Sequence, residues 1–326
     1  MRIVGGVFLG LFLFLLWSWA TLAIYYSNLP SLSLRAIAAG AFGLGSLGAF
    51  LWFPNRWRTI RYFLSAFLLV LVWWSLIPAS NDRDWRPEVA VLAHATFDGD
   101  VVTVHNIRNF DYSTRDDFTI QYYDKTYDLA TLQSVDFIVS YWGGIEAIAH
   151  TFLSFGFADG DYLAISIEVR PEKGETYHPI KGFFKQYELI YVIGDERDLV
   201  RVRANHRGED VYLYRTTISP AQARILFQDM LRRANTLADE PAFYRTIGQN
   251  CTTSLINHFN LISPKKIRFH RKIVLNGYSD ELAYERGRIA SDLPFPEMKR
   301  AHRITEIAQA YDDDPEFSRK IRAKLG

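Results

Sequence analysis

The stretch His150-Thr151-Phe152-Leu153-Ser154-Phe155-Gly156-Phe157, followed after a short loop by Tyr162–Arg170, decides the fold of this chain. Both segments are rich in β-branched and aromatic residues and are bounded by Gly and Asp, so they predict the two strands of a hairpin. The same composition predicts further strands before and after this hairpin. They are Val101–Val104, Val135–Trp142 and Asp210–Thr217, with a second hairpin of Tyr187–Ile193 and Leu199–Arg203, whose alternating charges predict a solvated or ion-paired sheet face.

The register of the first hairpin follows from its loop. A three-residue loop, Ala158-Asp159-Gly160, pairs Leu153 with Ile165 and keeps the apolar residues on one face, whereas a two-residue turn mixes the faces. With the three-residue loop, His150 lies opposite Glu168, within cross-strand reach.

Helices are predicted after the strands. Ser219-Pro220-Ala221-Gln222 combines a capping Ser, Pro at the first helical position and Gln at the third, which is typical of a helix start. Asn250 is a good cap for a helix that begins at Cys251, and another helix is predicted near Ile304–Tyr311. Strands first and helices afterwards indicate an α+β domain, in which an antiparallel sheet carries flanking helices.

The N-terminal part of the chain is mostly apolar. Three runs, Val4–Tyr26, Ala36–Phe53 and Tyr62–Pro78, are each close to the roughly 20 residues that a helix needs to cross a bilayer. We therefore expect a membrane anchor of three transmembrane helices over residues 1–79 and a globular domain over residues 80–326.

The basic residues predict the orientation of this anchor. Arg2 precedes the first run and Arg56, Arg58 and Arg61 lie between the second and third, so the positive-inside rule places both sites in the cytoplasm. Three crossings then make the chain a multi-pass protein of a bacterial inner membrane, with its C-terminal domain in the periplasm. An alternative is a cleaved signal peptide, for which Thr21-Leu22-Ala23 offers small residues at the cleavage positions. A signal peptide would also export the C-terminal domain.

Composition narrows the chemistry. The formal net charge is +1 and no basic block is present, which argues against nucleic acid as a partner. The chain has one cysteine, so an intramolecular disulfide is excluded, and the absence of paired Cys or His-x-x-x-His spacing argues against a metal site. We expect no cofactor, and the oligomeric state is not predicted.

The single cysteine, Cys251, is the candidate nucleophile. A thiol at a helix N-terminus is activated by the helix dipole, and it needs an imidazole to take its proton. His258 lies seven residues further along the same helix, about 10 Å from Cys251, which is too far for a direct hydrogen bond. His150 is the best candidate among the eight histidines, and Glu168 is positioned to orient it. Two structural alternatives stay open: a buried cysteine that acts as a small hydrophobe, and a His–Glu pair that only supports the sheet.

A family resemblance covers the same residues. The strings His150–Phe155, Ala158–Arg170, Tyr187–Tyr191, Glu196–Leu199 and Asn250-Cys251-Thr252-Thr253 resemble the Lnb N-terminal periplasmic domain family, over roughly residues 101–284. The resemblance implies a circularly permuted, papain-like Cys/His fold, because the family is named after a lipoprotein N-acyltransferase with these properties. It carries the family's cysteine and histidine over to Cys251 and His150. This chain departs from the named enzyme because its few membrane segments precede the domain.

These observations predict a membrane-anchored periplasmic cysteine acyltransferase. Cys251 attacks an ester of a membrane lipid, His150 is the base, Glu168 orients it, and the acyl group passes to an amine such as a lipoprotein N-terminus. Asn250, Thr252 and Tyr244 are the predicted residues for substrate and oxyanion support. One alternative is a cysteine amidase or peptidase that acts on envelope peptides or peptidoglycan. Another is a scaffold of the cell envelope without enzymatic activity.

Overall fold

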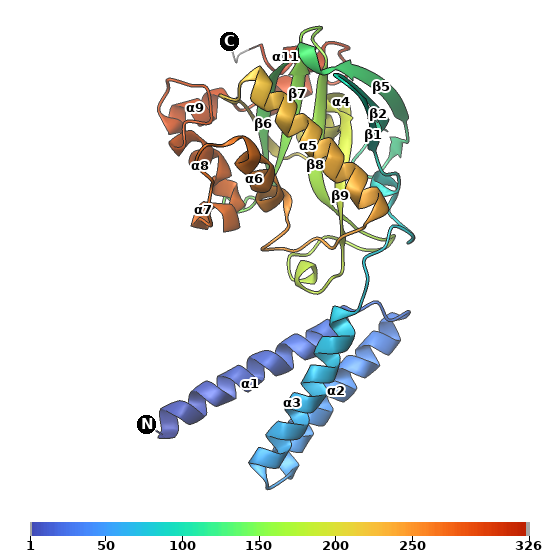
Figure 1. Cartoon of the computed structure of the whole chain (residues 1–326), viewed down its shortest axis with the longest axis vertical. Helices are drawn as coiled ribbons and strands as arrows, with labels where there is room; N and C mark the ends of the chain where they lie inside the picture. The colour runs from blue at the N-terminus through green and yellow to red at the C-terminus, as the bar shows by residue number, and fades with distance from the viewer. Residues whose placement is uncertain (1, 324–326) are drawn as a thin grey trace. The chain divides into compact units, whose positions relative to one another are not determined.

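The computed structural model describes residues 2–323, and its chain divides into two compact units (Figure 1). The first unit comprises the chain up to residue 80 together with segments 176–188 and 243–246. The second comprises segments 81–175 and 189–242 and the chain from residue 247. The first unit therefore takes in two later segments that the predicted division into residues 1–79 and 80–326 does not include.

Three helices form most of the first unit: α1 (Arg2–Tyr25), α2 (Leu32–Trp52) and α3 (Arg56–Ser75). Capping side chains start the second and third, because Ser31 and Asn55 accept hydrogen bonds from backbone N–H groups of the first turn. Two of the three helices, over Gly5–Tyr25 and Leu32–Trp52, are long and apolar enough to cross a membrane. The third falls short of that measure, in contrast to the prediction of three such helices, because three arginines lie in its first turns.

An eight-stranded sheet forms the centre of the second unit. Its order is β1-β2-β9-β8-β7-β6-β10, with β5 paired to β2. The strands are β1 (His94–Asp98), β2 (Val101–Arg108), β5 (Tyr122–Asp128), β6 (Leu132–Tyr141), β7 (Ala149–Phe157), β8 (Tyr162–Arg170), β9 (Glu188–Asp195) and β10 (Asp210–Arg215), and a separate pair is formed by β3 (Asp111–Tyr112) and β4 (Phe118–Thr119).

The hairpin of β7 and β8 has the predicted register. Leu153 pairs with Ile165, and the loop residue Gly160 has a φ of +87°, which an L side chain rarely adopts. Strand alternation therefore directs the odd-numbered residues of β7 to one face of the sheet and the even-numbered residues to the other.

Two predictions about the sheet are wrong. The sheet is mixed rather than antiparallel, because β2 and β9 run parallel where Arg108 pairs with Gly194. The second predicted hairpin does not form. β9 ends at Asp195, whose side chain caps α4 (Glu196–Leu199), and a π-helical turn (Val202–His206) follows where the second strand was expected.

Helices cover both faces of the sheet. α5 (Pro220–Asp239) lies across β7 and β8 in Figure 1, and its Phe227 contacts Phe155 of β7 with ring centroids 4.9 Å apart. α6 (Cys251–Ile262) packs on the same face, because the hydroxyl of its Thr252 lies 3.2 Å from that of Thr151, which points to the same side of β7 as Phe155. On the other face, Phe152 belongs to a core that includes residues of α4 and of two C-terminal helices. The remaining helices are α7 (Arg271–Val274), α8 (Ser279–Glu285), α9 (Phe295–Ala301), α10 (Thr305–Ala310) and α11 (Phe317–Lys320).

Candidate functional site

Cys251 is the first residue of α6, and the predicted helix start is confirmed. The Asn250 side chain accepts a hydrogen bond from the backbone N–H of Thr253 at 2.8 Å, and the backbone N–H of Asn250 donates to the Thr253 hydroxyl at 2.9 Å. This reciprocal pair fixes the first turn. The first N–H groups of a helix have no partner within it, so this end of α6 stabilises negative charge that develops at the buried Cys251.

Asn276 brings a side-chain amide close to the sulfur. Its Nδ2 lies 3.6 Å from Cys251 Sγ and donates to Thr252 Oγ1 at 3.1 Å and to the carbonyl of Ala149 at 2.5 Å. Its Oδ1 accepts from the backbone N–H of Ala149 at 3.0 Å. Asn276 therefore ties the first turn of α6 to the start of β7, and its Nδ2 also lies within hydrogen-bond distance of the thiol. Sequence reasoning missed this residue, although the Asn276-Gly277 dipeptide is a recognisable turn signal.

His150 lies in a buried polar chain on β7 and β8. The Ser166 hydroxyl donates its proton to Glu168 Oε1 at 2.7 Å, so its oxygen accepts from His150. The Nε2 of His150 therefore carries a proton and donates to Ser166 Oγ at 2.6 Å. His150 Nε2 is 3.7 Å from the same carboxylate oxygen, so the predicted proximity of His150 and Glu168 is confirmed. This order of hydrogen bonds leaves Nδ1 as the nitrogen with a free lone pair. Arg203 closes the chain with an ion pair to Glu168 at 2.8 Å.

Burial and the nearby charges keep His150 neutral. Burial is the largest cause that lowers the pKa of His150, and the positive charge of Arg203 lowers it by more than the Glu168 carboxylate raises it, so that the pKa is about 3. Burial alone would raise the pKa of Glu168, but the charges around it, Arg203 foremost, together outweigh burial and hold that pKa well below its usual value. The pair is therefore a neutral imidazole beside an ionised carboxylate at neutral pH.

The His150 ring and the Cys251 thiol lie on different faces of the sheet. Thr151 contacts Thr252 on α6, so its neighbour His150 points the other way, toward the face that carries Phe152. Among residues 2–323, neither group makes a hydrogen bond to the other. The structure thus brings Glu168 to His150, and Asn276 to Cys251, but it does not join the two pairs.

Two of the three residues predicted for oxyanion support lie at the start of α6. Asn250 caps α6, and Thr252 Oγ1 lies 3.7 Å from Cys251 Sγ. Tyr244 belongs to the first unit, where its backbone N–H donates to the carbonyl of Tyr187 at 2.9 Å and its ring contacts Tyr177.

His258, on the same helix as Cys251, is buried and fully engaged. Its Nε2 is 2.6 Å from the hydroxyl of Tyr191 on β9, and its Nδ1 is 2.5 Å from a carboxylate oxygen of Asp229 on α5. Both partners lie on the α5–α6 side of the sheet, so His258 joins α6 to α5 and β9. Neither contact could be predicted from the sequence, because both partners are distant in the chain.

An apolar cavity of about 80 Å³ lies beside the first turn of α6. Its walls come from α6, α8 and the sheet, and they include Thr252, Leu255, Phe259, Leu282 and Phe137. A cavity needs only about 10–15 Å³ to hold one water, but a water also needs polar partners, so this apolar cavity favours an aliphatic occupant. Through Thr252 the cavity adjoins the thiol.

Comparison with known proteins identifies the family of this segment. Residues 119–276 match the model of the Lnb N-terminal periplasmic domain family, and the predicted resemblance is confirmed over these residues. The matched segment contains His150, Glu168 and Cys251, and its last residue is Asn276. No curated protein and no solved structure matches the chain.

Proposed function

We propose, from the membership of residues 119–276 in the Lnb N-terminal periplasmic domain family, that this chain is a membrane-anchored acyltransferase that works through the thiol of Cys251. The observation that carries this proposal is the position of the only cysteine, at the first turn of α6, with the Asn276 amide against its sulfur. The histidine strand β7 precedes the cysteine helix α6, and this order supports a circularly permuted, papain-like fold.

The chemistry has two balanced steps. In the first, the Cys251 sulfur attacks the carbonyl carbon of a lipid ester, a C–S bond forms, the ester C–O bond breaks, and the alcohol leaves with the thiol proton. In the second, an amine attacks the thioester, a C–N bond forms, the C–S bond breaks, and the amine proton restores the thiol. The amide of Asn276 and the first N–H groups of α6 stabilise the oxyanion in both steps.

His150 is the proposed proton acceptor, through the lone pair on Nδ1. The transfer requires the ring to leave Ser166 and turn toward α6, because strand alternation directs it to the opposite face. His150 is the second residue of β7, and Gly143 and Gly144, both at φ +69°, precede that strand. Ala149 and His150 are also paired with Tyr141 and Ser140 of β6, and Asn276 holds the backbone of Ala149, so this turn has to break contacts of the strand as well as the hydrogen bond to Ser166.

Labelled lipid tests this function. The full chain in detergent is incubated with a phospholipid that carries a radiolabelled acyl chain and with a synthetic lipopeptide that has a free amino terminus. We expect label on the protein that hydroxylamine removes, followed by amide-linked label on the lipopeptide, and neither in Cys251→Ala. Release of free fatty acid alone, with or without the lipopeptide, would instead support a hydrolase, and no labelling at all would support a scaffold.

The role of His150 is tested separately in the same assay. If it is the base, His150→Gln lowers the rate of thioester formation by about 100-fold or more, because general bases contribute at least this much. An unchanged rate would show that His150, Ser166 and Glu168 form a structural chain, and it would leave the role of Cys251 intact.

A further inference from the structure

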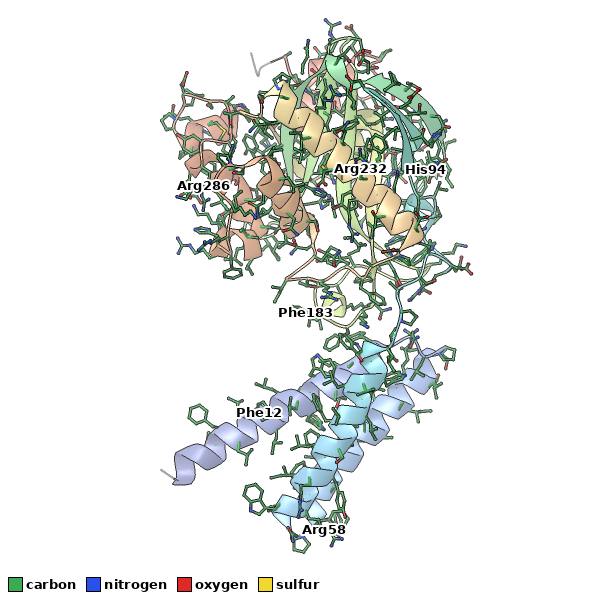
Figure 2. The ribbon with its side chains drawn as sticks, viewed as in Figure 1. Phe12, Arg58, His94, Phe183, Arg232 and Arg286 are labelled. Atoms are coloured by element: carbon green, nitrogen blue, oxygen red, sulfur yellow. The ribbon has the colours of Figure 1, made fainter. Side chains whose placement is uncertain are left out.

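Segment 176–188, which leads from β8 into β9, exposes three apolar side chains. Tyr177, Ile180 and Phe183 are each between 42% and 47% exposed. Ile180 precedes the short 3₁₀-helix η3 (Lys181–Phe183) and Phe183 ends it (Figure 2), and the backbone N–H of Phe183 donates to the carbonyl of Ile180 at 3.1 Å. Side chains three residues apart in such a turn lie on the same side, so Ile180 and Phe183 point together into the surroundings of the chain.

This segment lies against the ends of the apolar helices. Its Phe184 contacts Trp19 and Tyr26 near the end of α1, with ring centroids 6.4 and 5.6 Å apart. Its Lys185 donates to the carbonyl of Trp74 at the end of α3 at 3.1 Å, and the ammonium lies 4.8 Å from the centre of that ring. Trp and Tyr are enriched where a transmembrane helix meets the membrane surface. Because α1 is long and apolar enough to cross a membrane, the headgroup region of that membrane falls beside this segment.

The charge of this part of the chain suits an anionic surface. Segments 176–187 and 243–246 belong to the same unit, and Thr246 joins them, because its hydroxyl donates to the carbonyl of Pro179 at 2.8 Å. They contain no acidic residue and three basic ones, Lys181, Lys185 and Arg245. Anionic headgroups attract lysine and arginine close to a membrane. Apolar and basic side chains together are typical of segments that lie in a membrane surface.

We propose that segment 176–188 lies in the headgroup region of the membrane and inserts Ile180 and Phe183 among the acyl chains of anionic phospholipids. The transfer of these two side chains from water into lipid favours the inserted position. This inference rests on the membrane anchor of the proposed function and does not depend on the chemistry at Cys251. Only four residues separate segment 243–246 from Cys251, so the lipid-bound part of the chain leads directly into the helix that begins with the thiol.

A depth measurement tests this inference. Cys251→Ser removes the only cysteine of the full chain, and Phe183→Cys then carries the fluorophore NBD. The labelled chain is reconstituted into vesicles of phosphatidylcholine and phosphatidylglycerol. We expect the label to lie about 5–10 Å into the boundary between headgroups and acyl chains, the depth of interfacial segments. At that depth, doxyl groups on the lipid acyl chains quench the label, and iodide in the water does not.

Labels at two other phenylalanines are the references. Phe12→Cys, at an exposed side chain of α1 (Figure 2), should report lipid, and Phe269→Cys, at an exposed side chain of the second unit, should report water. If iodide quenches the label at Phe183 as strongly as that at Phe269 while Phe12 reports lipid, the inference is overturned and the proposed function stands. Water around the label at Phe12 would instead contradict the membrane anchor itself, and the inference with it.

Ile180→Asp tests the apolar contact without moving the label. A carboxylate is unfavourable among acyl chains, so this substitution should raise iodide quenching at Phe183 to the level found at Phe269. Ile120→Asp is the matched control, because Ile120 is 54% exposed and belongs to the second unit, and it should leave the Phe183 label in lipid. A label at Phe183 that neither iodide nor the doxyl lipids reach would mean that a protein surface covers the segment, and this result would also refute the inference.

Discussion

The ionisation of His150 should be visible in the acid stability of the chain. An unfolded histidine takes up a proton near its ordinary pKa of 6.5, whereas burial delays this in the folded chain to about pH 3. Between these values the unfolded state binds more protons, so the free energy of unfolding decreases as the pH falls. His150 contributes up to about 1.4 kcal/mol per pH unit to this slope.

We therefore predict that His150→Gln makes stability less sensitive to acid. The unfolding of the full chain in detergent, followed by urea titration at several pH values between 6.5 and 4, should show a smaller slope in the variant. His94→Gln removes an exposed imidazole at the start of β1 and serves as the control. An equal slope in His150→Gln and the unmodified chain would mean that the buried chain of His150, Ser166 and Glu168 does not hold the imidazole neutral.

Asn276 shows why part of the candidate site could not be predicted from the sequence. Cys251 and its helix cap were predictable, because the cap signature is local. Asn276 reaches the sulfur only because Gly277 lets two loops meet: a Cβ at that glycine would lie 1.9 Å from the carbonyl oxygen of Glu146. Such contact between irregular segments leaves no periodic pattern in the sequence.

At the scale of elements, the hairpin of β7 and β8 was predictable and the segment after β9 was not. The hairpin register depends on neighbouring residues, namely a three-residue loop with Gly160 and the alternation of apolar side chains. In the segment after β9, charges alternate as they do along an exposed strand. Two of these residues, Glu196 and Asp198, are instead fully buried in a helix.

Distant partners explain that difference. Glu196 pairs with Arg322 at 2.5 Å, and Asp198 pairs with Arg108 at 2.8 Å. Burial of an unpaired carboxylate would be strongly unfavourable, so the helix depends on arginines from the far end of the chain and from β2. The predicted ion pairing of these charges is correct, but the predicted strand is wrong, because the arginines that pair with them are distant in the chain and the local sequence does not indicate them.

Lys185 joins a later segment of the first unit to the end of α3. Its Nζ donates to the carbonyls of Trp74, Ser75 and Ile77 at 3.1, 3.0 and 2.9 Å. The last carbonyls of a helix have no partner within it, and a cation at this end is favourable. Phe184 adds a stacked contact with Tyr26, with ring centroids 5.6 Å apart. Segment 176–188 is therefore held to the helices of its own unit.

We predict that Lys185→Ala loosens this segment. The loss of three hydrogen bonds from a charged donor should cost about 1–2 kcal/mol of local stability, and cleavage by chymotrypsin after Phe183 or Phe184 should become about tenfold faster. Lys181→Ala, in the same segment, is the control, because the Lys181 side chain makes no hydrogen bond or ion pair within residues 2–323. Equal cleavage of the two variants would show that Lys185 does not hold the segment.

At the scale of the whole molecule, the membrane topology depends on α3. With α1 and α2 as the only crossings, the chain returns to its starting side, and a cytoplasmic N-terminus would leave the family's periplasmic domain in the cytoplasm. A third crossing resolves this. We propose that α3 crosses, because its 20 residues correspond to about 30 Å, the thickness of the hydrocarbon core.

Fusions to alkaline phosphatase, which is active only after export, test this topology. The three arginines at the start of α3 belong in the cytoplasm under the positive-inside rule, because they keep that end of the helix from translocating. A fusion after Gly326 should therefore be active and a fusion after Asn55 inactive, with fusions to β-galactosidase showing the reverse. Deletion of residues 56–75 should make the alkaline phosphatase fusion after Gly326 inactive, whereas the fusion after Asn55 should stay inactive. If the fusion after Gly326 is inactive in the intact chain, α3 does not cross, and Cys251 has no access to periplasmic substrates.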